Sequence, residues 1–404
     1  MSFETRRPLI QELEKLRGSR IICFLTSVRL GVMAMIADDQ VRVLFDHLQR
    51  LDQKPTPKLD IFLCSNGGSG TVPWRLVALF REFATSFSVL IPYRAYSAAS
   101  LLALGADEIV MHPFAELGPI DPTVSNDYNP VEKTTGRRLG ISVEDVRAYV
   151  NFIKETVGIT HEDELIRAVE ALTAQVHPLS LGNVERFVMQ SRMIARKILK
   201  THMKEEADEH KMDEIIENMA SKLYFHGHPI NREEARNDLR LKVAKDLNPK
   251  LETLMWDLYQ DFETEFENRT EFNPAMHLAN HPVPLPPLAH PPQAGDLTEA
   301  YYIQPQSPPP PNPQTPAPNL PTYECEILYA MIESSALSSS YRSKRRFTLL
   351  PSPQPTQPMI REDILKQGWT HSQAQPAAPR APHSPPSAAG APSGAAPPAE
   401  STGP

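Results

Sequence analysis

Two short stretches of the sequence hold the residue types that acyl transfer to a hydroxyl group requires. The stretch YRAYSAASLLALG places Ser97 at the start of an Ala- and Leu-rich helix, shortly after the apolar run FSVLI. The stretch LCSNGGSG places Gly67 and Gly68 between another apolar run and a helix. Acyl transfer needs a nucleophile at an exposed turn, a proton acceptor, and backbone N–H groups aimed at the developing oxyanion.

Backbone N–H groups at both corners are suited to an oxyanion. The N–H of Ala98, in the first turn of its helix, has no acceptor within the helix, and glycine adopts backbone conformations that other residues avoid. Each corner also has an ordinary interpretation, because Ser97 is a suitable helix N-cap and paired glycines suit a simple turn. Two other serines are weaker nucleophile candidates, since Ser65 is expected to cap its loop and Ser100 to pack inward.

The residues around these corners alternate between strands and helices. Strands are predicted at 21–26, 59–64, 87–91 and 108–111, and helices at 37–51, 71–84 and 97–105. The stretch 21–37 as a whole is expected to form two short strands around a turn. Such units make right-handed crossovers in a mostly parallel sheet, whose ligand site lies outside the carboxyl ends of the strands. The two corners are therefore expected to lie side by side.

The chain divides into a folded unit, residues 1–270, and a proline-rich tail, residues 271–404. Runs such as QSPPPPNPQTPAP offer too little apolar area to offset the entropy of ordering, so the tail is predicted to be largely disordered. The exception is YECEILYAMI (323–332), which suits a helix or a docking strand, and the basic cluster YRSKRR (341–346) is expected to be solvated linker charge. Amphipathic helices are predicted at 143–157, 162–176, 181–203 and 213–225, where they would cover the sheet or build an assembly.

Composition excludes several classes of function. A net charge of −8 leaves no basic footprint for nucleic acid, and no apolar run is long enough to span a membrane. Three widely spaced cysteines, Cys23, Cys64 and Cys325, indicate free thiols in a reducing cytoplasm. The HGH stretch has no third ligand in sight, and no GxGxxG follows a strand, so neither a metal nor another cofactor is expected.

The order of motifs resembles the Clp protease/crotonase superfamily and, within it, the serine dehydrogenase proteinase family, which is related to signal peptide peptidase A. The likeness rests on IPYRAYSAASLLALGADEIVM, ELGPIDP, HPLSLGNVERF and LYFHGHPINREEA, between about residues 21 and 243. It implies an α/β fold of repeated ββα units under helical cover, a peptide or protein substrate, and a homo-oligomer. It also implies Ser97 as the nucleophile, with Gly68 (or its neighbour Gly67) and Ala98 as oxyanion donors.

The proton acceptor departs from the superfamily pattern. Where a Clp protease places its triad histidine, this chain has ELGPIDP, with Asp121 and no histidine. A Ser–Lys dyad, as in the signal peptide peptidase branch, is therefore favoured over a Ser–His–Asp triad, and Lys133 is the nearest lysine downstream. His112, at the end of a strand, is the alternative base. His177, His226 and His228 lie in family motifs, and the HGH stretch that holds the last two is expected to shape the turn into the next helix.

The sequence thus predicts a cytoplasmic serine peptidase that forms an acyl-enzyme at Ser97. Two alternatives share the fold. One is a catalytically weak or inactive scaffold whose proline-rich tail recruits partners. The other is a crotonase-like enzyme, which would use the same two N–H donors to hold the enolate of an acyl-CoA thioester and would need no serine.

Overall fold

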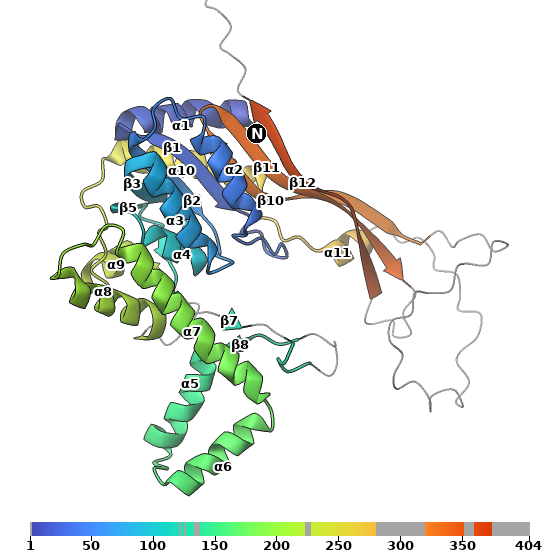
Figure 1. Ribbon diagram of the computed structural model, residues 1–404. Coiled ribbons are helices and arrows are strands. Elements are labelled where there is room, and N and C mark those ends of the chain that lie inside the picture. The colour runs from blue at the N-terminus through green and yellow to red at the C-terminus, as the bar shows by residue number, and fades with distance from the viewer. Residues whose placement is uncertain are drawn as a thin grey trace, which may run out of the picture.

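A seven-stranded sheet organises the fold (Figure 1). The computed structural model describes residues 2–120, 123–124, 127–132, 138–222, 228–279, 320–350 and 359–373. The strands run in the order β12-β11-β10-β1-β2-β3-β5. Their bounds are β1 Arg20–Thr26, β2 Thr56–Cys64, β3 Ala84–Ile91, β5 Glu108–Met111, β10 Thr322–Ser334, β11 Leu337–Leu350 and β12 Met359–Gln373.

The N-terminal half of the sheet is parallel, as predicted. Strands β1, β2, β3 and β5 pair in parallel, and their register aligns one β-branched residue from each into a continuous row: Ile22, Ile61, Val89 and Ile109. Branched side chains pack well on a pleated surface, and strands covered on both faces can be apolar throughout. The four predicted parallel strands and the helices between them are confirmed, but the second short strand predicted within 21–37 is wrong, because only Ile36 forms a bridge there and its partner is Gly68 in a loop.

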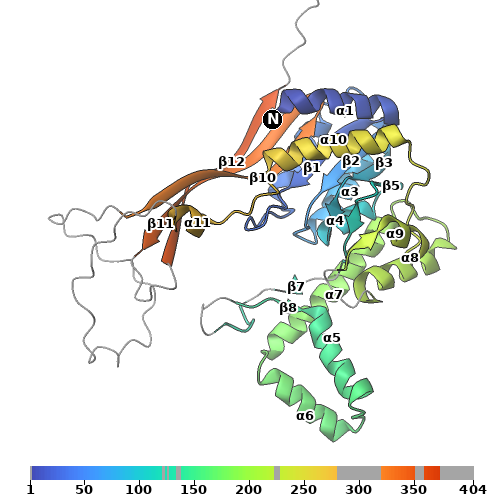
Figure 2. The ribbon, with the colours of Figure 1, turned by 180° about the vertical axis from the view of Figure 1, so that it is seen from behind.

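Helices cover both faces of the sheet. One face carries α2 (Asp39–Leu48), α3 (Val72–Phe83) and α4 (Ala98–Ala103), and the other carries α1 (Phe3–Arg17) and α10 (Pro249–Glu265) (Figure 2). Alternate residues of each strand enter two separate cores, so that Ile61 packs toward α2–α4 and Phe62 toward α1 and α10. The α/β fold with a parallel sheet under helical cover is therefore confirmed.

The C-terminal strands correct the expected domain boundary at residue 270. Strand β10 pairs antiparallel with β1, and β11 and β12 extend the sheet from it, so residues 322–350 and 359–373 belong to the folded unit. The segment 323–332, singled out as a docking strand or helix, lies in β10. The physical reason is that β1 would otherwise present an unpaired edge, which β10 covers with apolar residues such as Ile332. The other proline-rich residues of the expected tail lie outside the described ones.

A buried ion cluster fastens β10 to the helices beneath it. The Arg6 guanidinium donates to Glu333 of β10 at 2.8 Å and to Asp261 of α10 at 2.7 Å. Arg6 is 1% exposed and Glu333 is 0% exposed. Burial alone would lower the pKa of Arg6, but hydrogen bonds and charges from Glu333 and Asp261 outweigh it and raise that pKa above its ordinary value. The cluster thus joins the first helix to a strand more than 300 residues later.

A helical arm projects from the carboxyl edge of the sheet (Figure 1). Its helices are α5 Val143–Asn151, the π-helical turn η1 Phe152–Thr156, α6 Glu162–Thr173 and α7 Pro178–Leu199. Helix α7 reaches back to the core, where Ala195 and Ile198 are buried. Helix α6 buries none of its residues, so the prediction that it covers the sheet is wrong within this single chain.

Smaller elements complete the described chain. They are helices α8 Asp208–Glu217, α9 Arg232–Asn237 and α11 Pro274–Ala279, the π-helical turn η2 Asn218–Lys222, and strands β4 Arg94–Ala95, β6 Glu116–Leu117, β7 Thr123–Val124, β8 Ile141–Ser142 and β9 Ile230–Asn231. Strands β4, β6 and β9 form a separate sheet at the carboxyl edge of the main one. This small sheet frames the corner that holds Ser97.

Candidate active site

The backbone at Ser97 is held in an unusual conformation. Ser97 lies between β4 and α4, with φ 52° and ψ −113°. Residues with a Cβ rarely adopt a positive φ outside the left-handed helical region, and such a conformation costs about 1–3 kcal/mol. The Ser97 side chain forms no capping hydrogen bond and is partly exposed. The hydroxyl is thus not used as a helix cap, and strain of this kind is concentrated at functional sites.

The two corners lie side by side, as the sequence predicts. The N–H of Ser65 donates to Arg94 O, and the N–H of Tyr96 donates to Ser65 O, each at 3.0 Å. These bonds tie the end of β2 to the residue immediately before Ser97. The Ser65 hydroxyl is completely buried and bonds to Thr26 Oγ1 at 2.7 Å, while it accepts the Gly67 N–H at 3.1 Å. Ser65 therefore holds its loop, as expected, and is inaccessible as a nucleophile.

The paired glycines pack directly against Ser97. Gly67 has φ 98° and Gly68 has φ 152°, both in regions that favour glycine. A Cβ on Gly67 would lie 2.8 Å from Ser97 Cβ and 3.2 Å from Ala98 N, so no larger residue fits there. The Gly67 N–H is already bonded to Ser65, whereas the N–H groups of Gly68 and Ala98 have no acceptor among the described residues.

Buried contacts hold the first turn of helix α4 in place after Ser97. Ala98 and Ala99 are completely buried. The Ser100 hydroxyl lies 2.7 Å from both Ala95 O and Gly118 O, either of which can accept its proton, and it accepts the Gly118 N–H at 3.1 Å. Ser100 thus packs inward, as expected, and it ties α4 to the small sheet rather than facing a substrate.

A pocket of about 360 Å³ opens beside Ser97. One wall is the loop Gly68–Thr71, and the opposite wall is α7, which contributes Phe187, Gln190, Ser191 and Ile194. Leu101 and Ile120 make its base apolar. Phe187 is the last residue of the motif HPLSLGNVERF, but no residue of that motif was predicted to line the site. A pocket with an apolar base and polar rim next to a hydroxyl is suited to a side chain of a peptide.

Tyr96, the residue before Ser97, is not a suitable proton acceptor. Its hydroxyl donates to the Glu116 carboxylate. Burial, together with the hydrogen bond and charge of Glu116, raises the pKa of Tyr96 to about 12. The phenol therefore stays protonated near neutral pH and positions the corner instead.

The candidate bases predicted from sequence are not brought to Ser97 by the described residues. Lys133, the favoured one, lies outside the described residues, as do Asp121 and His226. His112 stacks on Trp256 of α10 at a centroid distance of 5.1 Å, on the sheet face opposite α4, and burial lowers its pKa. His112 does not line the pocket beside Ser97.

The family-motif histidines His177 and His228 both take part in local structure next to a helix. His177 begins α7, where its Nδ1 accepts the Leu179 N–H at 3.2 Å. His228 pairs with Glu234 of α9 at 2.8 Å. Among the described residues, no group of three His, Cys, Asp or Glu side chains is placed to hold a metal ion. Within the same part of the chain, every helix is too short or too polar to span a bilayer.

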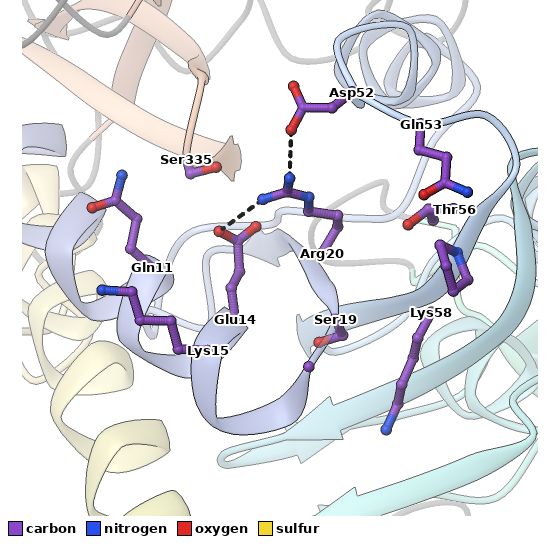
Figure 3. A pocket seen from close by; sticks show the side chains of 12 residues that line it. Gln11, Glu14, Lys15, Ser19, Arg20, Asp52, Gln53, Thr56, Lys58 and Ser335 are labelled. Atoms are coloured by element: carbon purple, nitrogen blue, oxygen red, sulfur yellow. Dashed lines mark hydrogen bonds and ion pairs between the residues drawn. The ribbon is translucent and has the colours of Figure 1, made fainter.

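A second hollow, of about 640 Å³, lies at the opposite, amino ends of β1 and β2 (Figure 3). Its charged groups largely neutralise one another: Arg20 pairs with Asp52 and lies 3.8 Å from Glu14. Burial raises the pKa of Glu14. The hydroxyl of Ser19 is bonded to Asp60 at 2.8 Å. The Ser97 corner, with its uncommitted hydroxyl and N–H groups, is therefore the candidate active site.

Comparisons with known proteins found a matching family model, two relatives and a solved structure. Residues 1–139 match the family model described as ClpP-like SDH-type serine proteinase. An uncharacterized protein of Methanocaldococcus jannaschii is 27% identical over 179 residues, which are 40% of this chain and 60% of that protein. A second uncharacterized protein of that organism is 22% identical over 259 residues, 63% of this chain and 78% of that protein.

The chain thus spans less than two thirds of the first relative's length. Among solved structures, a mutant of a membrane-bound stomatin-specific protease is similar with a TM-score of 0.31 and 14% identity. That likeness covers 57% of this chain and 83% of the other.

Proposed function

We propose that the protein is a serine peptidase acting through an acyl-enzyme on Ser97, from the premise that its first 139 residues match the model of the ClpP-like SDH-type serine proteinase family. The observation that carries the proposal is the strained Ser97 corner. The Ser97 hydroxyl makes no capping hydrogen bond and lines a pocket together with Gly68. The N–H groups of Gly68 and Ala98 beside it have no acceptor among the described residues. A serine that merely began a helix would need neither the strain nor the donors.

In the proposed reaction, Ser97 Oγ attacks the carbonyl carbon of a peptide bond while its proton passes to a base. The oxyanion accepts hydrogen bonds from the Gly68 and Ala98 N–H groups. Collapse of the tetrahedral intermediate expels the amine, which takes up the proton, and leaves an ester on Ser97. Water then attacks this ester, which releases the carboxylic acid and restores the serine. Leu101, Ile120 and Phe187 favour an apolar substrate side chain in the pocket.

Labelling with a fluorophosphonate probe tests the nucleophile. The wild-type protein should be modified at Ser97, as located by mass spectrometry, and Ser97→Ala should remain unlabelled with a nearly unchanged thermal midpoint. Ser69→Ala is the matched control, because Ser69 lines the same pocket but is exposed and bonded to Thr71 at 3.1 Å. Modification at Ser69, or retention of activity by Ser97→Ala, would exclude Ser97 as nucleophile.

We propose Lys133 as the base of a Ser–Lys dyad, since no described residue that lines the pocket is a lysine or histidine. Lys133→Met should reduce labelling to the level of Ser97→Ala. Lys133→Arg should do the same, because guanidinium keeps the charge but does not deprotonate. Lys154→Met, on the exposed arm, serves as the control. Loss of labelling in His112→Gln but not in Lys133→Met would instead identify a Ser–His enzyme.

The proposal includes a cytoplasmic homo-oligomer, with the helical arm as its contact. Ile166 and Val169 on α6 are 50% and 53% exposed, which is unusual for two large apolar residues one turn apart. Light scattering should therefore give a mass above that of one chain, and Ile166→Asp should lower it. A monomeric wild-type protein would contradict this part of the proposal.

A non-catalytic scaffold of the same fold is the second candidate. It is favoured by the lack of a base among the described residues that line the pocket. The same probe separates the two, because a scaffold would leave Ser97 unmodified even at high probe concentration.

A further inference from the structure

The extended segment on the far side of the Gly-Gly loop determines how that loop faces Ser97. The Ile36 N–H donates to Gly67 O at 2.7 Å, and the Ser69 N–H donates to Ile36 O at 2.8 Å. Together these bonds form a parallel bridge between Ile36 and Gly68. In such a bridge the residue between the two bonds turns its own N–H and C=O to the opposite side. The Gly68 N–H is thus directed away from Ile36, and both Gly68 and Ser97 line the pocket.

The backbones of Ile36 and Gly68 are in close contact, with no room for a side chain between them. A Cβ on Gly68 would lie 2.3 Å from Ile36 O and 2.4 Å from Ile36 N. Ile36 is completely buried. If Ile36 shifted along the chain direction, the Gly68 peptide would therefore move with it, because Ile36 is hydrogen-bonded to both neighbours of that glycine, Gly67 and Ser69.

A buried glutamine fixes Ile36 from both ends. The side-chain oxygen of Gln40 accepts the Ala37 N–H at 3.1 Å, and its amide nitrogen donates to Met35 O at 2.9 Å. Gln40 is only 4% exposed. Its two amide atoms thus bind the residues immediately before and after Ile36, which is the arrangement of a clamp on a single extended residue.

We propose that Gln40 is a positioning residue for the oxyanion donor at Gly68. It holds residues 35–37 in register with Gly67–Ser69, and that register aims the Gly68 N–H at the oxyanion. Gln40 does not touch the reacting atoms, so its effect passes entirely through backbone. The inference rests on the proposed function, because it assigns Gln40 a part in the same acyl transfer.

A purely structural role would look different in experiment. Gln40 lies in the first turn of α2, where its side chain also satisfies a backbone N–H just before the helix. If that were all, losing it would lower stability and leave the reactivity of folded protein unchanged. A positioning role instead lowers the maximal labelling rate, kinact, without changing KI, the probe concentration at half that rate. A small misplacement of a catalytic group can cost about 100-fold in rate.

The experiment measures kinact and KI for a fluorophosphonate probe on the full chain below its unfolding temperature. Gln40→Ala should lower kinact by about 10- to 100-fold with KI within twofold of wild type. Gln49→Ala, an exposed glutamine at the other end of α2, is the matched control and should keep both values.

Gln40→Glu keeps the shape of the side chain and decides the case if Gln40→Ala fails to fold. Its carboxylate still accepts the Ala37 N–H but has no proton to donate to Met35 O. The ratio of its kinact to that of wild type should therefore rise as pH falls from about 8 to 6 and the buried acid regains its proton. Wild-type kinact in Gln40→Ala or Gln40→Glu at every pH would overturn the inference while leaving Ser97 as nucleophile. Absence of Ser97 labelling in the wild type would overturn the proposed function and, with it, this inference.

Discussion

Removing Glu333 should destabilise the fold strongly, because it leaves the Arg6 charge partly stranded. Glu333 is completely buried and binds the Arg6 guanidinium through both carboxylate oxygens, each at 2.8 Å. Breaking a buried pair by removing one partner costs about 3–5 kcal/mol. Asp261 still accepts one hydrogen bond from Arg6, so we expect Glu333→Ala to fall near the lower end, about 3 kcal/mol. That is more than a hundredfold in the folding equilibrium.

Urea unfolding followed by circular dichroism measures this cost. Glu324→Ala on the same strand is the control, since Glu324 pairs with Arg346 at the surface and its loss should barely move the midpoint. In an Arg6→Met background the loss of Glu333 should cost much less, because no guanidinium is then left unpaired. If the urea midpoint of Glu333→Ala were close to that of Glu324→Ala, the reasoning would be refuted, and the Arg6–Glu333 contact on β10 would contribute little to the free energy of unfolding.

Three further predictions concern the site and its surroundings. Gly67→Ala should abolish probe labelling, because its Cβ would lie 2.6 Å from Tyr96 O, whereas Gly70→Ala, with nothing within 4 Å, should label normally. Ser97→Gly should have a free energy of unfolding about 0.5–2 kcal/mol higher than that of Ser97→Ala, because glycine adopts the positive φ without strain. Equal urea midpoints for the two variants would argue against strain. Burial lowers the pKa of His47 from 6.5 to about 3, so the unfolded chain binds the proton more tightly and stability should fall as pH drops below about 6.5. His47→Gln should flatten that slope, which is at most about 1.4 kcal/mol per pH unit, in urea titrations between pH 7 and 5.

The meeting of the two corners was predictable because it follows from local patterns. Apolar runs marked β2 and β3, and neighbouring parallel strands must end at the same edge. The types of the flanking residues then placed Gly67 and Ser97 together. The roles of Ser65 and Ser100 followed from the same placement.

The C-terminal strands were not predictable from local pattern, because their stability is non-local. The cluster YRSKRR has the composition of solvated linker, yet Arg346 pairs with Glu324 on β10 and Arg345 with Glu362 on β12. These partners lie on neighbouring strands, 22 and 17 residues away, in segments that proline-rich runs flank. Likewise, only one residue of the second strand predicted within 21–37 pairs, Ile36, and its partner Gly68 could not be read from either stretch alone.

The position of β10 beside β1 has a consequence for how the chain is made. Strand β1, which ends at residue 26, leaves the ribosome well before its partner, which emerges only when residue 334 has been synthesised. At about 5–20 residues per second, the interval after residue 26 is roughly 15–60 seconds. During that time the apolar edge of β1 is open to any other strand, and the Arg6 charge has no Glu333 to bind. The parallel strands are thus translated before the strand that completes their sheet, so one edge of β1 stays unprotected while the rest of the chain is made.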